Sequence, residues 1–288
     1  MGPDERFDCR HAPYCPSMVG KSENSYMRTP TLIAGAIATL AVFLWPPISQ
    51  APDYHVMADQ RTCLGIANCL NVLSNVPFAI IGILGLIATL GPGSVRSFSS
   101  DPWVRLPYAV LFVGVLTTAV GSSYYHLAPD NARLVWDRLP MTLGFMGLLT
   151  ALIAERINRQ VGRRLFWPLI ALGAGSVLYW YWGELRAAGD LRLYVIVQFG
   201  SLVVVALVLA LYESRYTDNT YLIAGLVAYG VAKLFELADR PIFEFGEIVS
   251  GHTLKHLAAA AAIAFIARML RMRTPLAPLA RSASPTGA

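Results

Sequence analysis

Long apolar stretches, separated by short polar connections, run through most of this chain. Eight of them come close to the roughly twenty residues that a helix needs to cross the hydrocarbon core of a bilayer. They cover residues 31–47, 70–90, 104–126, 138–154, 165–182, 192–212, 221–238 and 252–270. Backbone groups in lipid must be satisfied within their own segment, and the alternating pattern of barrel strands is absent from the sequence. Each stretch therefore predicts a membrane-spanning helix.

The two ends of the chain differ from this apolar middle. Residues 1–30 are polar and lack the short apolar core of a cleavable signal peptide. Residues 274–288 are rich in Pro, Ser and Ala, which predicts a disordered tail. The first apolar stretch carries no small-residue cleavage pattern, so we expect it to persist as a helix. The expected architecture is one all-α domain, a polytopic membrane helix bundle.

Composition and charge agree with a membrane protein and argue against nucleic acid as a partner. Of the 288 residues, 55% are hydrophobic and 14% are charged, whereas roughly a quarter would be charged in a soluble domain. The net charge of +5 is accounted for by the loops, since no basic patch with interleaved aromatic residues stands out.

Lys and Arg are divided unequally between the two ends of the predicted helices. Eight spans place both termini on the same side, and that side carries about fifteen Lys and Arg against about six on the other. The positive-inside rule makes the richer side cytoplasmic. We therefore expect both termini in the cytoplasm.

Polar side chains near the helix ends gather on the other, non-cytoplasmic half. An ionisable residue inside a membrane segment is a functional-site hypothesis by default, and chance would scatter such residues between both faces. The pattern predicts a water-accessible polar pocket that opens away from the cytoplasm. Its candidate members are Asn71, Ser74, Asn75, Ser122, His126, Asp137, Glu236, Asp239, His252 and His256.

Three histidines are the candidates for metal ligands in this pocket. His252 and His256 are four residues apart and therefore share one helix face, and His126 is the candidate for a third imidazole. Three neutral imidazoles with an open position for water form the ligand set of a catalytic zinc site. Asp137 could orient a ligand or accept the proton of the attacking water, and Ser122 could bond that water or a carbonyl oxygen.

Every one of these positions also has a structural interpretation. A lone buried histidine is usually a hydrogen-bonded core residue, and the pair on the last helix could instead ligate haem or link helices. Asp137 precedes a first-turn proline and could cap the fourth helix. Ser122 could hydrogen-bond a backbone carbonyl of its own helix. Asn71 and Asn75 could link helices through their side-chain amides. An interfacial charge cluster could account for Glu236, Asp239 and Arg240. The coincidence of all these positions on one face favours a shared site.

The four cysteines do not form a zinc signature, because neither pair has the C-x2-C spacing. Cys9 and Cys15 lie in the polar start, and Cys63 and Cys69 flank the beginning of the second predicted helix. The second pair could form a disulfide if its side of the membrane faces an oxidising compartment.

Several of these strings together resemble the alkaline ceramidase family. They are NVLSN at 71–75, SSYYH at 122–126, the acid at Asp137, and HTLKH at 252–256. That family belongs to a wider set of seven-helix membrane hydrolases that includes the progestin and adiponectin receptors. The resemblance runs from about residue 59 to residue 271. It implies a seven-helix ceramidase-like domain at 59–272, with 31–47 as an extra leading helix, and favours a bacterial inner membrane.

The resemblance implies an intramembrane zinc amidase that cleaves the N-acyl bond of ceramide-type membrane lipids, releasing a fatty acid and a sphingoid base. The zinc ligands correspond to His126, His252 and His256. Ser122 and Asp137 correspond to the residues around the catalytic water. Asp239 matches an acidic position before the last helix, and Asn75 belongs to the motif that favours the ceramidase branch. A different class of function, a receptor or a proton-coupled transporter that uses the histidines structurally or as a relay, is the alternative.

One stretch departs from the pattern of the family, which has a calcium site built from several acids before its first helix. Here Asp59 is the single acid of that stretch, with Asn68 and Asn71 as further oxygen donors and Arg61 as a like-charge deterrent. Calcium takes six to eight oxygen ligands, so at most a weak calcium or headgroup site is expected. Arg61 could instead pair with Asp59. Neither the particular N-acyl lipid nor the oligomeric state follows from the sequence.

Overall fold

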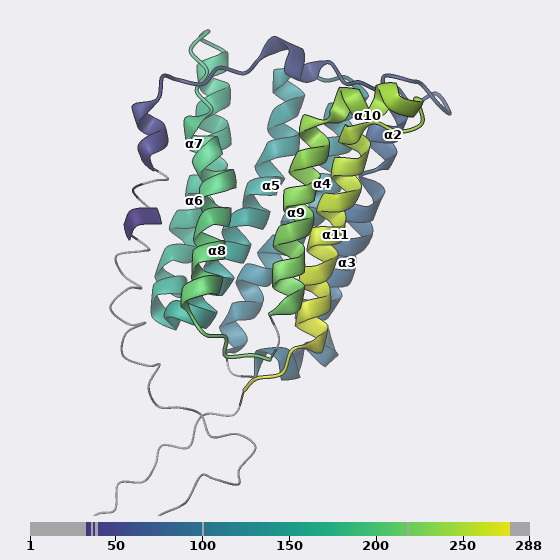
Figure 1. The fold of residues 1–288 in the computed structure, drawn as a ribbon. Coiled ribbons are helices and arrows are strands. Elements are labelled where there is room, and N and C mark those ends of the chain that lie inside the picture. Colours follow the sequence, from purple (N-terminus) through teal and green to yellow (C-terminus); the bar gives the residue numbers. More distant parts are fainter. Residues whose placement is uncertain (1–32, 36, 38–39, 100, 218, 277–288) are drawn as a thin grey trace, which may run out of the picture.

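Seven helical spans stand side by side in the described part of the chain (Figure 1). The computed structural model describes residues 33–35, 37, 40–99, 101–217 and 219–276. The spans long and apolar enough to cross a membrane are Cys69–Leu90, Pro102–Leu127, Asn131–Ile157, Arg159–Glu184, Arg192–Leu211, Thr220–Leu237 and Gly251–Met272. The predicted class, an all-helical membrane bundle, is confirmed.

The spans are assembled from α-helices joined by shorter helical turns. The α-helices are α2 (Cys69–Leu73), α3 (Val76–Leu90), α4 (Arg105–Leu127), α5 (Asn131–Leu152), α6 (Arg159–Glu184), α7 (Arg192–Val195), α8 (Ser201–Leu211), α9 (Thr220–Leu237), α10 (Asp239–Gly246) and α11 (Gly251–Met272). Wider π-helical turns at Ile153–Ile157 and Ile196–Gly200 extend α5 and join α7 to α8. Short 3-10 turns occupy Ala41–Leu44, Pro52–His55, Pro92–Phe98 and Pro102–Val104. Helix α4 packs against α3 and α5, and α9 packs against α11.

The predicted leading helix at 31–47 is not among the seven spans of the described residues. In its described part the chain is helical at 33–35, 37 and 40 and ends in the 3-10 turn Ala41–Leu44. The other residues at the start of that stretch lie outside the described residues. So do the predicted polar segment 1–30 and residues 277–288 of the predicted tail. The first three residues of that tail, 274–276, are described and pair with the backbone of residues 215–217, so the prediction of disorder is wrong for them.

Helix α5 begins earlier than predicted, at Asn131 rather than near residue 138. The Asp130 carboxylate accepts a hydrogen bond from the backbone N–H of Arg133 at 2.7 Å, which is the geometry of an N-cap. Asp137 consequently lies one to two turns inside the helix, and the capping role considered for it is wrong. Pro140 lies inside the helix rather than in its first turn.

A close approach between α4 and α5 follows from that proline. Proline has no N–H, so Pro140 leaves the carbonyl of the residue four positions earlier, Trp136, without its helical donor. Gly121 of α4 lies against that same carbonyl, and a Cβ atom at position 121 would overlap it. A glycine is therefore required where the two helices place Ser122 and Asp137 next to each other.

Replacing Gly121 by alanine is expected to destabilise the bundle by about 1–3 kcal/mol, because the backbone of α5 must move to admit the methyl group. Thermal unfolding of the detergent-solubilised protein measures the change. Gly175 on α6 is the matched control, since a Cβ there meets nothing within 4 Å. Gly175→Ala should be neutral or stabilising, as expected for alanine in a helix interior. Equal effects of the two changes would contradict this interpretation of the α4–α5 contact.

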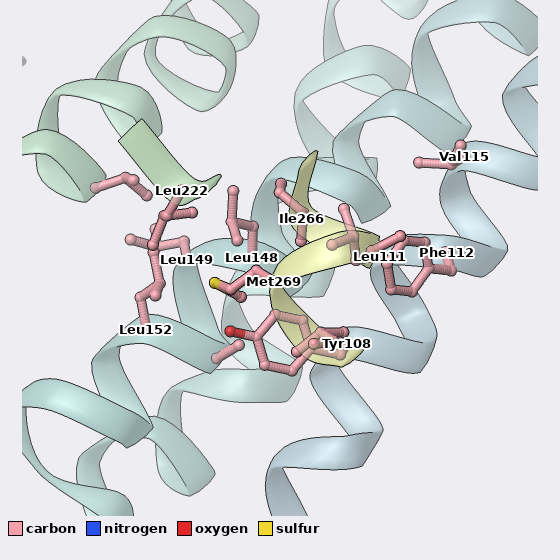
Figure 2. Close-up of a cluster of buried hydrophobic side chains, with 14 of the residues drawn as sticks. Tyr108, Leu111, Phe112, Val115, Leu148, Leu149, Leu152, Leu222, Ile266 and Met269 are labelled. Carbon is pink, nitrogen blue, oxygen red and sulfur yellow. The ribbon is translucent and has the colours of Figure 1, made fainter. Parts of the chain in front are cut away.

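The main apolar core lies toward the Arg-rich end of the bundle, and Figure 2 shows part of it in close-up. Side chains of four helices meet there: Tyr108, Leu111, Phe112 and Val115 from α4, Leu148, Leu149 and Leu152 from α5, Leu222 from α9, and Ile266 and Met269 from α11. Val115 is eleven residues before His126 on α4, a separation of roughly 16 Å along a helix. Apolar packing thus dominates one half of the bundle, where Glu155 and Arg273 form a buried ion pair beside Tyr108, and the three histidines lie in the other half.

Candidate metal centre

Three imidazoles meet at the end of the bundle opposite the apolar core. His126 lies in the last turn of α4, and His252 and His256 lie in the first two turns of α11. Their side chains are 1%, 7% and 4% exposed. The Nε2 atoms of His126 and His252 are 3.2 Å apart. One nitrogen from each of the three rings lies within 4.8 Å of the others.

This arrangement fits a single small divalent cation. A tetrahedral zinc ion with bonds of about 2.0–2.1 Å holds neighbouring ligand nitrogens about 3.3 Å apart, close to the observed 3.2 Å. The two ligand nitrogens that lie farthest apart are within 4.8 Å of each other. This distance is at most about 1.5 Å longer than in a tetrahedral zinc site. A small rotation of one imidazole ring removes the difference. Among the described residues, His126 Nδ1 is buried and has no hydrogen-bond partner. The ring thus has one nitrogen next to His252 Nε2 and the other without a protein partner in the described part of the chain, whereas a structural core histidine usually has both nitrogens bonded.

Ser74 sets the orientation of the His256 ring. Its Oγ lies 2.8 Å from His256 Nδ1 and also donates to the backbone carbonyl of Asn71. The serine hydroxyl thus accepts the Nδ1–H of the ring, which leaves Nε2 unprotonated and free for a metal. Partners of this kind fix the tautomer of metal-binding histidines. The sequence indicated a polar residue at this position but not its contact with the last helix.

Removing this partner should weaken metal binding without abolishing it. Ser74→Ala is expected to lower zinc affinity by about 10- to 100-fold, the usual effect of losing such a partner. Competition with a chromophoric chelator measures the affinity. Ser123→Ala is the matched control, because the Ser123 hydroxyl bonds a backbone carbonyl, Val72 O, and not an imidazole. An unchanged affinity in Ser74→Ala would show that the His256 ring is held by other contacts.

The first turn of α11 is fixed by two side chains that precede it. Ser250 caps the helix by accepting a hydrogen bond from Thr253 N. Asp239 accepts one from His252 N at 2.7 Å and another from Ala58 N at 3.1 Å. The acidic position expected before the last helix therefore fastens the His252 backbone to the loop that crosses this end of the bundle (Figure 1).

Ser122 and Asp137 lie beside the histidines on α4 and α5. The Ser122 hydroxyl is a hydrogen-bond partner of the Asp137 carboxylate, and both side chains line the same cavity as His256. Ser122 is buried and Asp137 is partly buried. A carboxylate and a hydroxyl next to an imidazole cluster can accept and return a proton at one position.

The residues of the weak calcium or headgroup site have other contacts in the structure. Asp59 is paired with Arg61 at 2.8 Å, as the alternative interpretation had it. The Arg61 guanidinium, which hydrogen-bonds Asp59, holds the pKa of that carboxyl below its usual range. Asn68 donates to the backbone carbonyl of His126 at 2.8 Å. The side chain of Asn71 donates to the backbone carbonyl of Asp59.

The two asparagines of the 71–75 motif make different kinds of contact. The amide oxygen of Asn71 accepts from Thr253 Oγ1 at 3.0 Å and so joins α2 to α11. Asn75 donates to the backbone carbonyl of Asn71 at 2.9 Å. The Asn71 contact agrees with the interpretation of such amides as ties between helices, whereas Asn75 bonds to carbonyls of its own span. Both asparagines support the helix that carries Ser74.

Cys63 and Cys69 form a disulfide just before and at the start of α2, with their Cα atoms 5.5 Å apart. The separation lies within the range that a disulfide bridges. The bond closes a short loop on the side of the bundle where the histidines lie. A disulfide at this position is typical of a side that faces an oxidising compartment.

A cavity of about 550 Å³ extends from the histidines into the bundle between α4, α5, α9 and α11. His256 is the member of the cluster that lines it, together with Ser122 and Asp137. Apolar side chains line the far end, Leu222 and Ile266 among them. Because Ile266 is ten residues beyond His256 on α11, the cavity follows this helix for roughly 15 Å.

The sequence predicted only some of the charged side chains that line the cavity. Glu236 of α9 is paired with Lys233, as the spacing of three residues allowed, and with Lys255 of α11 at 3.1 Å. Lys255 lies between the two histidines of the last helix in sequence, but its partner is visible only in three dimensions. Arg138, for which the sequence indicated no role in the pocket, is buried in the cavity wall.

Comparison with protein-family models and with curated protein sequences found no match to this chain.

Proposed function

We propose that the protein is a metal-dependent membrane hydrolase that cleaves the N-acyl bond of a lipid amide of the ceramide type. One observation carries the proposal: three buried imidazoles within reach of one ion lie beside Ser122 and Asp137, at the polar end of a long apolar cavity. This combination provides a hydrolytic centre and a place for an alkyl chain in the same space. The order of the motifs, which resembles the alkaline ceramidases, supports the same reaction.

A zinc ion held by His126, His252 and His256 would lower the pKa of water at its open position and polarise a carbonyl group. Asp137 accepts the proton of the attacking water as the new C–O bond forms. Asp137 then returns that proton to the amide nitrogen as the C–N bond breaks, which releases a carboxylic acid and an amine. Ser122 donates to the ionised Asp137 carboxylate and positions it. Once Asp137 has taken up the proton, the Ser122 O–H is free to donate to the carbonyl oxygen, where negative charge develops.

The shape of the cavity supports a lipid as the substrate. Its apolar wall between α9 and α11 would hold the acyl chain and exclude water from the far end. The carbonyl would lie at the end where His256, Ser122 and Asp137 converge. An alkyl chain in this place stays in an apolar surrounding throughout the reaction, which suits a substrate that enters from the bilayer.

The orientation proposed for the chain places the histidines at the non-cytoplasmic face. With the leading helix 31–47 as an eighth span, both termini are cytoplasmic, and the Arg-rich ends of the helices face the cytoplasm. The Cys63–Cys69 disulfide on the side of the histidines supports this orientation. A bacterial inner membrane is the host membrane that the resemblance favours.

The ion-paired group in the cavity favours one rival function, a proton-coupled transporter. Lys233 and Lys255 lie in the cavity wall and are both paired with Glu236, and ionisable groups of this kind inside membrane segments are typical of proton pathways. That function predicts proton-coupled flux and no amide hydrolysis with any lipid.

Hydrolysis of a labelled lipid by the purified full chain distinguishes the proposed hydrolase from the transporter. Zinc-loaded protein in detergent micelles should release the labelled fatty acid from an acyl-labelled ceramide or a related N-acyl lipid. A chelator should stop the release, and added zinc should restore it. If zinc-loaded protein releases no acid from a panel of N-acyl lipids but moves protons across vesicles, the transporter is the better account.

A further inference from the structure

The cavity has a second polar position, away from the histidines, built around Arg138. This residue follows Asp137 on α5, but adjacent helical residues do not face the same way. Arg138 lines the cavity together with Tyr54 and Tyr194. Tyr54 belongs to the segment that crosses this end of the bundle, and Tyr194 belongs to α7. The guanidinium therefore lies at the polar end of the cavity, on the side formed by α5 and α7.

Among the described residues, Arg138 has no carboxylate partner at ion-pair distance. The residue is 5% exposed. Its Nη2 donates to Gln50 Oε1 at 2.7 Å, and its guanidinium carbon lies 4.5–5.4 Å from three aromatic ring centres. Its Nη1 is buried and has no hydrogen-bond partner in the described part of the chain.

A buried cation of this kind is costly unless something compensates it. Leaving a charged donor unpaired away from water carries a large penalty. The aromatic faces offset part of the cost through cation–π attraction, but they do not satisfy an N–H group. The two lysines of the cavity wall differ, because both are paired with Glu236. Arg138 is thus the cavity cation best placed to bind an incoming anion.

We propose that Arg138 binds an anionic oxygen group on the amine half of the lipid substrate: a carboxylate, sulfonate or phosphate. The inference rests on the proposed function for the position of the amide. With the acyl chain in the apolar part and the carbonyl beside His256, the amine half extends toward the polar end of the cavity, where Tyr54 and Arg138 lie. A planar guanidinium matches such groups with two parallel hydrogen bonds. The substrate class is then an acidic N-acyl lipid rather than a neutral one.

Binding of ligand pairs that differ in one acid group tests the proposal. The first pair is an analogue of N-dodecanoylglycine, in which a methylene replaces the amide N–H so that it cannot be hydrolysed, and the methyl ester of that analogue. The second pair is phosphorylated ceramide and ceramide. Tryptophan fluorescence of the zinc-loaded full chain in micelles reports binding. The acidic member of at least one pair should bind about 10- to 100-fold more tightly, as a charge-assisted hydrogen bond to arginine implies. The pair that shows the larger preference identifies the anion.

Variants test whether Arg138 is the residue that causes the tighter binding of the acidic ligands. Arg138→Gln should remove the difference between the acid and its neutral partner, and Arg138→Lys should keep part of it. Arg133→Gln is the matched control on the same helix, because Arg133 pairs with Asp130 and is not part of the cavity wall. It should leave the preference unchanged.

Equal affinity of wild-type protein for the acidic and neutral members of both pairs would overturn the proposal, and this result requires no variant to fold. An acid preference that survives in folded Arg138→Gln would also overturn it. Hydrolysis is scored separately on N-dodecanoylglycine, its methyl ester and ceramide. An acid preference in binding without hydrolysis of any amide counts against the proposed function alone. Hydrolysis of neutral ceramide without an acid preference counts against Arg138 alone.

Discussion

His252→Ala is expected to strip the protein of stoichiometric zinc and to lower amide hydrolysis by at least about 1,000-fold. The substitution removes the imidazole whose Nε2 lies 3.2 Å from that of His126, so that two ligands are left for the ion. A metal contributes several kcal/mol to the stabilisation of developing charge, and each 1.36 kcal/mol is a factor of ten in rate. Elemental analysis of the purified variant and turnover of a labelled lipid amide measure the two effects.

His55 is the matched control for this substitution. Its ring nitrogens contact Tyr125 Oη at 3.1 Å and Asn131 Oδ1 at 2.9 Å, and it lies outside the cluster of three. His55→Ala should keep its zinc and most of its activity. A His252→Ala protein that retains one zinc per chain and turns over at the wild-type rate would refute the assignment of His252 as a ligand.

Asp137→Asn should lower turnover by about 100- to 10,000-fold, the range usual for the loss of a general acid–base group. An amide has nearly the size of the carboxylate but cannot take up the proton of the attacking water. Because Asp137 is not one of the three clustered ligands, the variant should keep its zinc. Single-turnover kinetics together with elemental analysis separate the loss of proton transfer from the loss of metal.

Asp130 is the matched control residue for the Asp137→Asn substitution. It lies on the same stretch of chain and caps α5 through the Arg133 N–H, but it does not line the cavity. Asp130→Asn should retain activity, since asparagine caps helices about as well as aspartate. Wild-type turnover in Asp137→Asn would remove Asp137 from the scheme, and joint loss of metal and activity would give it a role in holding the ion.

The seven spans of the described residues could be predicted because lipid imposes one strong requirement, about twenty apolar residues for each crossing helix. The beginning of α5 could not be predicted in this way. Its first turns contain Asn131, Arg133 and Asp137, which are polar and lie outside the apolar stretch, so that only the Asp130 cap marks the boundary. The leading stretch 31–47 meets the requirement of length in part, and within its described residues no span of membrane length is found.

The candidate ligands could be selected from the sequence because spacing fixes which residues share a helix face. The spacing of four residues places His252 and His256 on one helix face. The predicted helix ends place His126 on the same side of the membrane, which suggested it as the third metal ligand. Contacts between helices have no such signature. The bond of Ser74 to His256 and the pairing of Lys255 with Glu236 depend on how α2, α9 and α11 pack.

The burial of Arg138 is another feature that could not be predicted from the sequence. In sequence Arg138 follows an acid near a helix end, and such a residue is ordinarily a solvated loop charge. Burial of this guanidinium requires Tyr54, Trp180 and Tyr194, which come from three separate parts of the chain. No local pattern joins residues so far apart, and the structure was needed to find the position.

X-ray absorption at the zinc edge, recorded on the purified full chain, tests the central claim most directly. Three imidazoles around one ion predict a four-coordinate first shell with three nitrogen ligands and one oxygen ligand at about 2.0–2.1 Å, and the multiple-scattering pattern of histidine rings. His256→Ala, like His252→Ala, leaves two imidazoles for the ion and should lose this first shell together with its stoichiometric zinc. A spectrum with sulfur ligands or a six-oxygen shell, or a protein that takes up no stoichiometric zinc, would contradict the account.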